Sequence, residues 1–345
     1  MSPAPKLLEV DDLRVKFLTE DGMLTAVDGV SFELDTGDVL AIVGESGCGK
    51  SVTSQTMMGL TRSPNARIEG SVKYKSEELL DAPDEVLHRI RGEELAMIFQ
   101  DPISALNPVY KVGAQIVEAI QAHEDVSDEI AKRRATELLA EVGIPDPARR
   151  VDEYPHEFSG GMRQRAMIAM ALALEPNVLI ADEPTTALDV TIQAQILRLL
   201  KRLNEDRGLA VIMVTHDLGV VADIADRVLV MYAGRVVESG SLDQIFYDPQ
   251  HPYTWGLIGS ITRLDRPPTH RLAQIKGQPP SLIGLPAGCH FRPRCPHAFD
   301  RCTEPPGLEV RGGGAGHEDR CWLSAEKKKT LRVVEGDIGL EAPAA

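Results

Sequence analysis

The spacing of apolar residues changes several times along the chain. Apolar and polar side chains alternate over residues 7–17 and 27–34, which predicts strands that cover one face of a core. Three short runs are almost entirely apolar and predict buried strands, at 39–43, 178–181 and 210–215. Each of these runs ends at glycines or polar residues, so we expect chemistry-bearing side chains at the strand ends.

A helical period dominates roughly residues 83–174, between the first two buried runs. Residues 226–240 predict a hairpin that turns at Ala233 and Gly234. Strands that alternate with helices indicate an α/β fold. From about Tyr247 the composition shifts towards proline, with Pro267-Pro268 and Pro279-Pro280. The last segment, 326–345, has no apolar period, and we expect it to be disordered.

Composition limits the partners and the compartment. The chain has 345 residues, enough for more than one domain, and its 37 basic and 52 acidic residues give a net charge of −15. Because an acidic surface repels phosphate backbones, we expect no nucleic-acid partner. The first residues lack the apolar core of a signal peptide, and the apolar run 166–174 is too short to span a membrane. These features predict a soluble, cytosolic chain.

A glycine-rich motif follows the first buried run and precedes a predicted helix. It reads Gly44, Glu45, Ser46, Gly47, Cys48, Gly49, Lys50 and Ser51, the pattern G-x-x-x-x-G-K-[ST]. Backbone N–H groups of such a loop curl around phosphate oxygens, and the helix N-terminus adds a positive end. Lys50 is expected to reach the β- and γ-phosphates, and the Ser51 hydroxyl to coordinate Mg²⁺. A chance match to a glycine-rich turn is disfavoured by the strand and helix around it.

Two carboxylates end the second buried run. The run delivers Asp182 to the strand tip, where it can hold the Mg²⁺ shell, and Glu183 beside it can polarise an attacking water. In isolation such acids are commonly just solvated. With a phosphate loop upstream, they predict a nucleotide triphosphatase.

The segment Phe158-Ser159-Gly160-Gly161-Met162 opens a helical run and forms a second anion-binding pattern. It resembles the signature Leu-Ser-Gly-Gly-Gln of the ATP-binding subunits of ABC transporters. In that family two subunits pair head to tail, and each signature caps the γ-phosphate bound by the other. Phe158 and Met162 differ from the commonest form, whereas the phosphate-contacting Ser-Gly-Gly is intact.

Other positions match further elements of the same family. By this resemblance, Gln100 is the Q-loop residue that touches the metal and senses the transmembrane partner. Asp189, in Ala187-Leu188-Asp189, belongs to the D-loop, which communicates across the dimer. His216 is the switch histidine that contacts the γ-phosphate, and the cofactors implied are ATP and Mg²⁺. Phe17 is either the aromatic residue that stacks on adenine or a core aromatic residue of a strand.

The resemblance covers roughly residues 7–325 and implies a domain organisation. Residues 1–246 are expected to form the ATPase domain, with an α/β P-loop core, an antiparallel β subdomain and a helical subdomain at about 83–174 that docks on the permease. Residues 247–325 are expected to form a C-terminal extension that carries four cysteines.

Three segments resemble the branch of oligopeptide and dipeptide importers: 99–108, 157–165 and His251-Pro252-Tyr253-Thr254. The resemblance implies a second ATPase subunit that is related but different, two transmembrane permease subunits and an extracytoplasmic peptide-binding protein. It places the chain at the cytoplasmic face of the membrane. An ATPase of a nickel or other small-solute importer is the alternative within the branch.

Non-transport ABC proteins are the rival class. A DNA-repair or chromosome protein predicts a long coiled-coil insertion, tandem cassettes or basic patches, and a ribosome-associated factor predicts two cassettes in one chain. The sequence has one copy of each motif and none of those features. We therefore favour the transporter ATPase.

Cys289, Cys295, Cys302 and Cys321 gather in the proline-rich extension, spaced C-x₅-C-x₆-C-x₁₈-C. A cytosolic setting disfavours disulfides. Unligated buried thiols are the plainest interpretation, but a segment with little core gains from a metal. Zinc sites generally use closer cysteine pairs, and Cys295-Pro296 resembles ferredoxin-type ligation, so we favour a structural [4Fe–4S] cluster over zinc. His290 or His297 could replace one cysteine.

Overall fold

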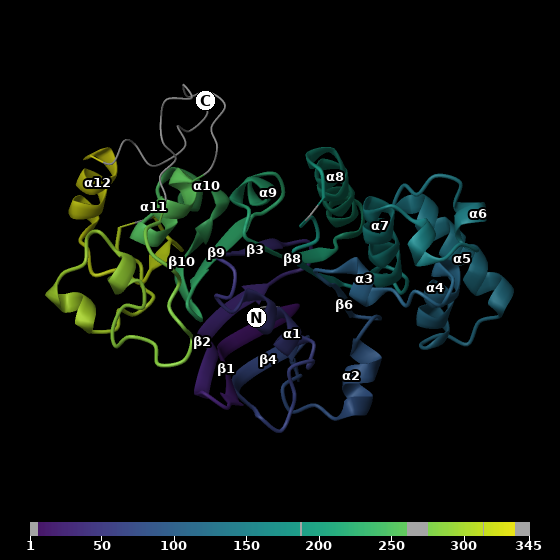
Figure 1. The fold of residues 1–345 in the computed structure, drawn as a ribbon, viewed down its shortest axis with the longest axis horizontal. Helices are drawn as coiled ribbons and strands as arrows, with labels where there is room; N and C mark the ends of the chain where they lie inside the picture. Colours follow the sequence, from purple (N-terminus) through teal and green to yellow (C-terminus); the bar gives the residue numbers. More distant parts are fainter. Residues whose placement is uncertain (1–5, 187, 261–274, 313, 335–345) are drawn as a thin grey trace, which may run out of the picture. The chain divides into compact units, whose positions relative to one another are not determined.

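The computed structural model describes residues 6–186, 188–260, 275–312 and 314–334 (Figure 1). The chain divides into two compact units, which are described separately. The first unit comprises Met1–Leu7, Leu34–Val39 and Asp81–Val214, and the second comprises Leu8–Glu33, Leu40–Leu80 and Thr215–Ala345. Along the described part of the chain, no helix combines the length and the apolar character needed to cross a bilayer.

The first unit contains three parallel strands in the order β8-β7-β6. They are β6 (Leu95–Ile98), β7 (Val178–Asp182) and β8 (Ala210–Thr215), and every residue in them is buried. The predictions of β7 and β8 are confirmed. Strand β6 lies inside the segment for which a helical period was expected. Its four residues are too few to show a period of their own.

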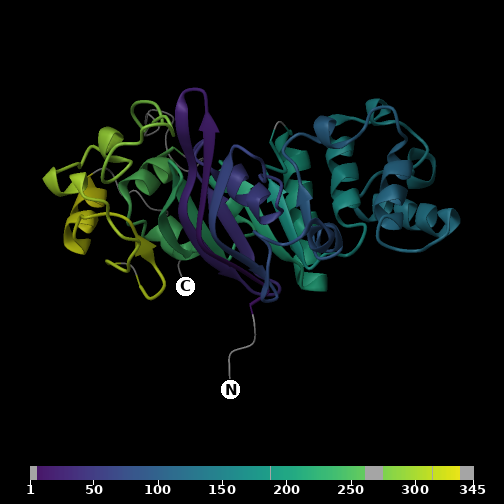
Figure 2. The ribbon, with the colours of Figure 1, turned by 90° about the horizontal axis from the view of Figure 1, so that it is seen from below.

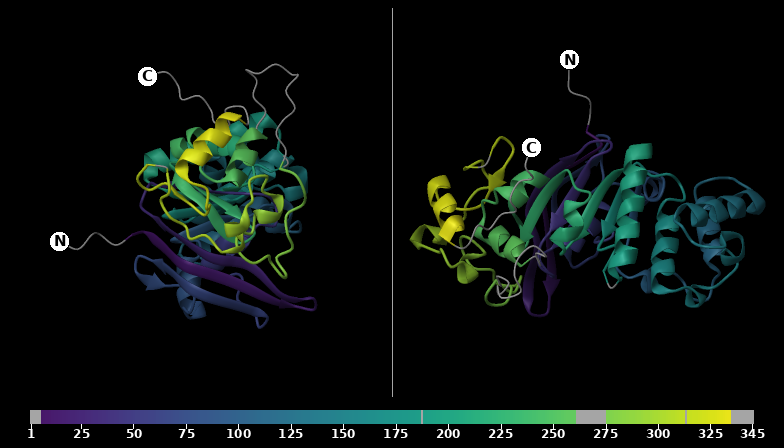
Figure 3. Two further views of the ribbon diagram at one scale, coloured as in Figure 1. Left: turned by 90° about the vertical axis from the view of Figure 1, so that its left-hand side faces the viewer. Right: turned by 90° about the horizontal axis from the view of Figure 1, so that it is seen from above.

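Helices make up most of the rest of the first unit (Figure 3). They are α2 (Asp84–Ile90), α3 (Pro102–Ala105), α4 (Val112–Gln121), α5 (Asp128–Glu141), α6 (Pro147–Arg150), α7 (Gly160–Ala171) and α8 (Val190–Arg207), with a 3-10 turn at Pro155–Glu157. Helices α4, α5 and α7 pack against one another. Several begin at side-chain caps, as where the Ser127 hydroxyl accepts from the Ile130 N–H at α5. Helices therefore dominate 83–174 as predicted, while its limits as a subdomain stay a prediction.

The second unit contains strands in the order β11-β10-β9-β3. They are β3 (Val39–Val43), β9 (Arg227–Tyr232), β10 (Arg235–Ser241) and β11 (Glu318–Asp319). Strands β9 and β10 form the predicted hairpin, with φ of 45° at Ala233 and 82° at Gly234. Two positive φ angles suit a two-residue turn because they match the twist of the strands.

A second, antiparallel sheet of this unit has the order β2-β1-β4-β5 (Figure 2). Its strands are β1 (Leu8–Thr19), β2 (Gly22–Leu34), β4 (Ala66–Tyr74) and β5 (Glu77–Glu78). The two alternating segments of the sequence are thus confirmed as strands. Strands β4 and β5 were not predicted. Strand β4 does alternate apolar and polar residues, with Ala66, Ile68, Val72 and Tyr74 on one face, and this signal was missed, whereas the two residues of β5 are too few to show a period.

Within its described residues, the second unit has one helix directly after its glycine-rich loop and four more in its C-terminal part. They are α1 (Lys50–Met57), α9 (Leu218–Ala222), α10 (Leu242–Tyr247), α11 (Pro252–Gly259) and α12 (Ala325–Val334), with 3-10 turns at Arg292–Arg294 and Asp300–Thr303. Helix α10 packs against β9 and β10.

Helix α12 corrects one expectation (Figures 1 and 3). Disorder was expected for 326–345, and this is wrong for residues 326–334. The Lys328 side chain is fully buried and its Nζ lies 2.7 Å from Oδ2 of Asp319, while Arg332 pairs with Asp248. These two pairs, with partners 9 and 84 positions away, hold the helix and leave no trace in its own apolar pattern. Residues 335–345, and Pro267-Pro268 of the predicted linker, lie outside the described residues.

Candidate functional site

The glycine-rich loop of the second unit has the shape expected of a phosphate-binding loop. Buried strand β3 ends at Val43, and α1 begins at Lys50 after the cap residue Gly49. Gly49 has φ of 106°, and a Cβ there would lie 2.2 Å from the carbonyl oxygen of Ala26. Only glycine fits at this point, so the backbone can turn its N–H groups inward ahead of the helix.

Lys50 is 95% buried, and its ammonium group closes the loop on itself. Nζ donates to the carbonyl oxygens of Gly44 at 2.8 Å and Glu45 at 3.1 Å. Both acceptors are neutral, so the charge of Lys50 is not cancelled by them. A phosphate oxygen is a stronger acceptor than either carbonyl, and the residues present therefore fit a nucleotide phosphate.

Two residues far along the chain hold the loop from outside. The N–H of Glu45 donates to the Tyr253 hydroxyl at 2.9 Å. The carboxylate of Glu45 accepts two hydrogen bonds from Arg294, at 2.5 and 3.0 Å. Sequence reasoning gave no such role to either residue; the only signal was that Tyr253 lies in the segment that resembles peptide importers.

In the first unit, the structure brings Gln100 and Glu183 together. Nε2 of Gln100 donates to Oε2 of Glu183 at 3.1 Å, and the Thr186 hydroxyl donates to the same oxygen at 2.8 Å. Glu183 is 8% exposed, and the preceding Asp182 is 2% exposed at the end of β7. A carboxylate held by two donors at a strand end can orient a water molecule. Thr186 is a residue that the sequence analysis missed.

The backbone of Glu183 is strained. Its φ is 48°, in the left-handed region that non-glycine residues rarely adopt. Its N–H donates to the carbonyl oxygen of Val214 at 2.8 Å, which helps to hold this conformation. Backbone strain of this kind gathers at functional sites, where surrounding structure maintains it.

The Ser-Gly-Gly segment lies at the start of α7. The Ser159 hydroxyl accepts from the Met162 N–H at 3.3 Å and caps the helix, as Asp189 caps α8 by accepting from Ile192 at 3.0 Å. A Cβ on Gly161 would lie 3.1 Å from the Ile192 side chain, whereas a Cβ on Gly160 would meet nothing within 4 Å. Helices α7 and α8 thus approach closely at Gly161, and Gly160 leaves open space in front of the helix start.

The positions of three other predicted site residues do not test the roles expected of them. His216 follows β8 directly and is exposed, in the second unit. Phe17 is half-buried in β1, paired with Ala66, so both of its interpretations stay predictions. Ala187 lies outside the described residues.

The four C-terminal cysteines line one cavity of about 20 Å³, together with apolar residues that include Phe291, Trp322 and Leu323. A cavity of this size admits about one water molecule, not four irons with their sulfides. Burial raises the pKa of Cys289, and it raises that of Cys321 to about 12, which disfavours the thiolate form that ligates metal.

The prediction of a [4Fe–4S] cluster is therefore wrong. Among the described residues, no group of three or more histidine, cysteine or acidic side chains could hold a metal ion, so zinc is not supported either. No disulfide joins the cysteines. The four thiols are unpaired and pack with aromatic and aliphatic neighbours: Cys302 and Cys321 are buried, and Cys289 and Cys295 are half-buried. Cys321 forms a small core with Trp255 and Leu323. Of the two histidines, His290 donates from Nδ1 to the Ala233 carbonyl oxygen across 3.0 Å, and His297 lies edge-on to Trp255.

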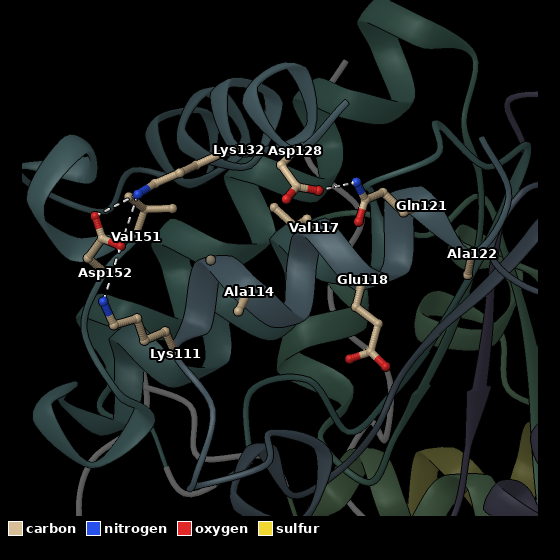
Figure 4. Close-up of a pocket in the computed structure, with 11 residues that line it drawn as sticks. Lys111, Ala114, Val117, Glu118, Gln121, Ala122, Asp128, Lys132, Val151 and Asp152 are labelled. Atoms are coloured by element: carbon tan, nitrogen blue, oxygen red, sulfur yellow. Dashed lines mark hydrogen bonds and ion pairs between the residues drawn. The ribbon is translucent and has the colours of Figure 1, made fainter. Parts of the chain in front are cut away.

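A separate hollow of about 540 Å³ lies between α4, α5 and the two residues that follow α6 in the first unit (Figure 4). Lys111 and Lys132 both point at Asp152 on its rim, and Gln121 donates to Asp128 at 2.8 Å. None of the predicted site residues lines it. Both of its lysines already pair with Asp152, so the described residues that line it offer no free cation to a ligand.

Comparisons with known proteins agree with the motifs. A family model described as "ABC transporter" matches residues 27–186, and one described as "Oligopeptide/dipeptide transporter, C-terminal region" matches residues 237–302. The dipeptide transport ATP-binding protein DppD of Bacillus subtilis (strain 168) is 50% identical over 334 residues, which are 96% of this chain and 98% of that protein. The oligopeptide transport ATP-binding protein OppD of Escherichia coli (strain K12) is 51% identical over 306 residues, 89% of this chain and 90% of that protein.

A solved structure shares the fold. The dimeric, post-hydrolysis structure of the ATP-binding cassette MJ0796 bound to ADP and Pi is 29% identical and has a TM-score of 0.62, covering 68% of this chain and 98% of that one. Fold and motifs together define an ABC-type ATPase, as the sequence predicted. The chain belongs to the ABC transporter family, in the branch of dipeptide and oligopeptide transport ATP-binding proteins. ATP and Mg²⁺ are consistent with that family.

Proposed function

We propose that this ATPase powers the import of dipeptides or oligopeptides through separate permease subunits. The observation that carries the proposal is about 50% identity to dipeptide and oligopeptide transport ATP-binding proteins along nearly the whole chain, C-terminal region included. The nickel-importer alternative has no comparable support.

The residues of each unit have distinct tasks in the proposed reaction. In the second unit, Lys50 and the N–H groups of the phosphate loop bind the β- and γ-phosphates, and His216 contacts the γ-phosphate. Bound Mg²⁺ would neutralise phosphate charge, held by Ser51, Asp182 and Gln100.

In the first unit, Glu183 orients the attacking water and accepts its proton. The two hydrogen bonds from Gln100 and Thr186, both to Oε2, fix the direction of the carboxylate. A base held in this way needs no reorientation when the reaction begins.

A second ATPase subunit completes the proposed site. Ser159, Gly160 and Gly161 would cap the phosphates bound by the partner subunit, and Asp189 would lie at the dimer contact. The space in front of Gly160 supports this, because a phosphate can approach the N-terminus of α7 there. We propose a related but different partner chain, two permease subunits and an extracytoplasmic peptide-binding protein, with the chain held peripherally at the inner face of the membrane.

Uptake by cells tests the proposal. Cells that lack the gene would be complemented with the wild-type chain or with Glu183→Gln, and uptake of labelled di- and oligopeptides and of radioactive nickel would be compared. The wild-type chain should restore peptide uptake only, and the variant should restore neither. Restored nickel uptake without peptide uptake, or equal peptide uptake by both chains, would contradict the proposal.

A further inference from the structure

The C-terminal region makes a direct ionic contact with the phosphate loop. Arg294 lies in the 3-10 turn between Cys289 and Cys295, and its two terminal nitrogens bind both carboxylate oxygens of Glu45, at 2.5 and 3.0 Å. This two-bond geometry between guanidinium and carboxylate is strong and directional. Glu45 is the second residue of the phosphate loop.

The Arg294 side chain is built into its place. It is only 5% exposed, and the same guanidinium donates to the carbonyl oxygens of Lys276 and Gly277, at 3.0 and 3.2 Å. The hydrogen bonds with Glu45 raise the pKa of Arg294 above its usual value. An exposed ion pair contributes little, but one this enclosed and this fully bonded holds its partners in a single geometry.

Tyr253 fixes the backbone of the same loop residue. Its hydroxyl accepts from the Glu45 N–H at 2.9 Å, and its ring is fully buried, 4.7 Å from the Tyr232 ring and 5.4 Å from the Phe291 ring. Glu45 is thus held through its backbone by α11 and through its side chain by the cysteine-bearing segment.

This arrangement matters because of what Lys50 does. Its Nζ now donates to the carbonyl oxygens of Gly44 and Glu45. When the ammonium turns to a phosphate, the loop loses these internal hydrogen bonds, and Arg294 and Tyr253 become the contacts that keep Glu45 in place. Arg294 also neutralises the Glu45 carboxylate, which would otherwise repel the triphosphate across the short loop.

We propose that Arg294 and Tyr253 are positioning residues for nucleotide binding, so that the C-terminal region sets the affinity of the phosphate loop for ATP. The inference rests on the proposed binding of ATP at this loop. The inference also gives the cysteine-bearing segment a function that needs no metal, because this segment carries Arg294 and holds it against Glu45.

Binding of a fluorescent ATP analogue to purified variants tests the inference. Arg294→Ala should weaken binding about tenfold, because it removes two charge-assisted hydrogen bonds and exposes the Glu45 charge. Adding Glu45→Gln to Arg294→Ala removes that charge and should recover the part of the loss that comes from charge repulsion, while the part that comes from the lost contact with Glu45 remains. A merely structural role for Arg294 would leave the double variant as weak as the single one.

Two further variants serve as checks. Tyr253→Phe keeps the ring packing and removes only the hydroxyl, and it should weaken binding about threefold with little change in thermal stability, so it also serves if Arg294→Ala does not fold. Arg301→Ala is the matched control: this arginine lies in the same segment but stacks on Trp322, 3.9 Å from the ring centre, and its loss should not change ATP binding.

The outcomes separate the inference from the proposed function. If the wild-type chain binds the analogue and Arg294→Ala and Tyr253→Phe bind it equally well, the positioning role is wrong and the ATP site stands. If Arg294→Ala and Arg301→Ala lose affinity equally, the effect is general destabilisation and the role is also wrong. A wild-type chain that bound no nucleotide would contradict the ATP site and the role of Arg294 together.

Discussion

The Nε2 atom of Gln100 donates to Oε2 of Glu183 across 3.1 Å, although the two residues are 83 positions apart. Gln100 follows β6 and Glu183 follows β7, and these strands are parallel neighbours, so both side chains emerge at one sheet edge. With Thr186 as a second donor, the carboxylate has a defined direction.

Glu183→Gln should abolish turnover while ATP binding persists. The amide keeps the shape of the side chain but cannot accept the proton of water, so kcat is expected to fall about a hundredfold or more. Steady-state hydrolysis and equilibrium nucleotide binding are the two measurements. Thr186→Val is the graded comparison: it removes one donor and keeps the base, so its kcat should fall less. Hydrolysis at the wild-type rate by Glu183→Gln would remove Glu183 from the mechanism.

Gly49 and Gly47 offer a matched pair in the phosphate loop. Gly49→Ala places a Cβ 2.2 Å from the Ala26 carbonyl oxygen, and we expect a loss of about 3 kcal/mol in the free energy of unfolding together with loss of ATP binding. Gly47 has φ of 77°, and a Cβ there would meet nothing within 4 Å. Gly47→Ala should therefore lower the free energy of unfolding only by the cost of a left-handed backbone, about 1 kcal/mol. Urea denaturation of the two variants would show the difference, and equal losses would mean that the close approach at Gly49 does not occur.

Gly160→Ala tests a contact with the partner subunit without disturbing the folding of this chain. A Cβ at Gly160 meets nothing within 4 Å of this chain, and alanine favours a helix start over glycine by up to about 1 kcal/mol, so thermal stability should be unchanged or higher. If a partner-bound phosphate approaches this glycine, hydrolysis by the assembled transporter should fall about tenfold or more. Full activity in a stable variant would rule out close contact at Gly160.

Because the His251 imidazole is buried, we expect the C-terminal region to lose folding stability in acid. The imidazole Nδ1 accepts from the Tyr253 N–H at 3.1 Å; burial, together with the charge of Lys328, lowers the pKa of His251 to about 3. In the unfolded chain the His251 imidazole is protonated near pH 6.5. The stability contributed by the neutral, buried imidazole is therefore fully present above that pH. It is lost as the pH falls towards 3, at about 1.4 kcal/mol per pH unit.

His251→Asn keeps a side-chain acceptor at the start of α11 and removes this titration, so unfolding free energies measured from about pH 7 to about pH 4 should fall less steeply than in the wild type. His88→Asn, at an exposed histidine, is the control and should leave the slope unchanged. An unchanged slope for His251→Asn would show that this imidazole does not cause the acid sensitivity.

Lys328→Met tests the buried ion pair that holds α12. Both side chains of the pair are 0% exposed, and without the ammonium the Asp319 carboxylate stays buried beside Glu238. Removing one partner of such a pair costs about 3–5 kcal/mol. Lys329→Met changes an exposed neighbour and should cost less than about 0.5 kcal/mol. Similar melting temperatures for the two variants would mean that α12 is not anchored by Lys328.

Much of the candidate site could be predicted from the sequence because its parts are contiguous. A phosphate loop needs a buried strand, glycines and a helix in immediate succession, and residues 39–57 contain all three. The carboxylates 182 and 183 and the Ser-Gly-Gly at 159–161 are read in the same local way. Strands β1 and β2 are readable from their alternation of apolar and polar residues, and β7 and β8 from their unbroken apolar runs.

Features that depend on contacts between distant parts of the chain could be seen only in the tertiary structure. Arg294 reaches Glu45 from 249 positions away, and neither residue has a local pattern that points to the other. Helix α12 is ordered by Asp319 and Asp248, not by its own lysine-rich sequence. The four cysteines suggested a cluster by their spacing alone, but the aromatic and aliphatic side chains that fold in among them leave room for about one water molecule. Spacing fixes which groups can meet; the volume and polarity of the place where they meet come from residues elsewhere in the chain.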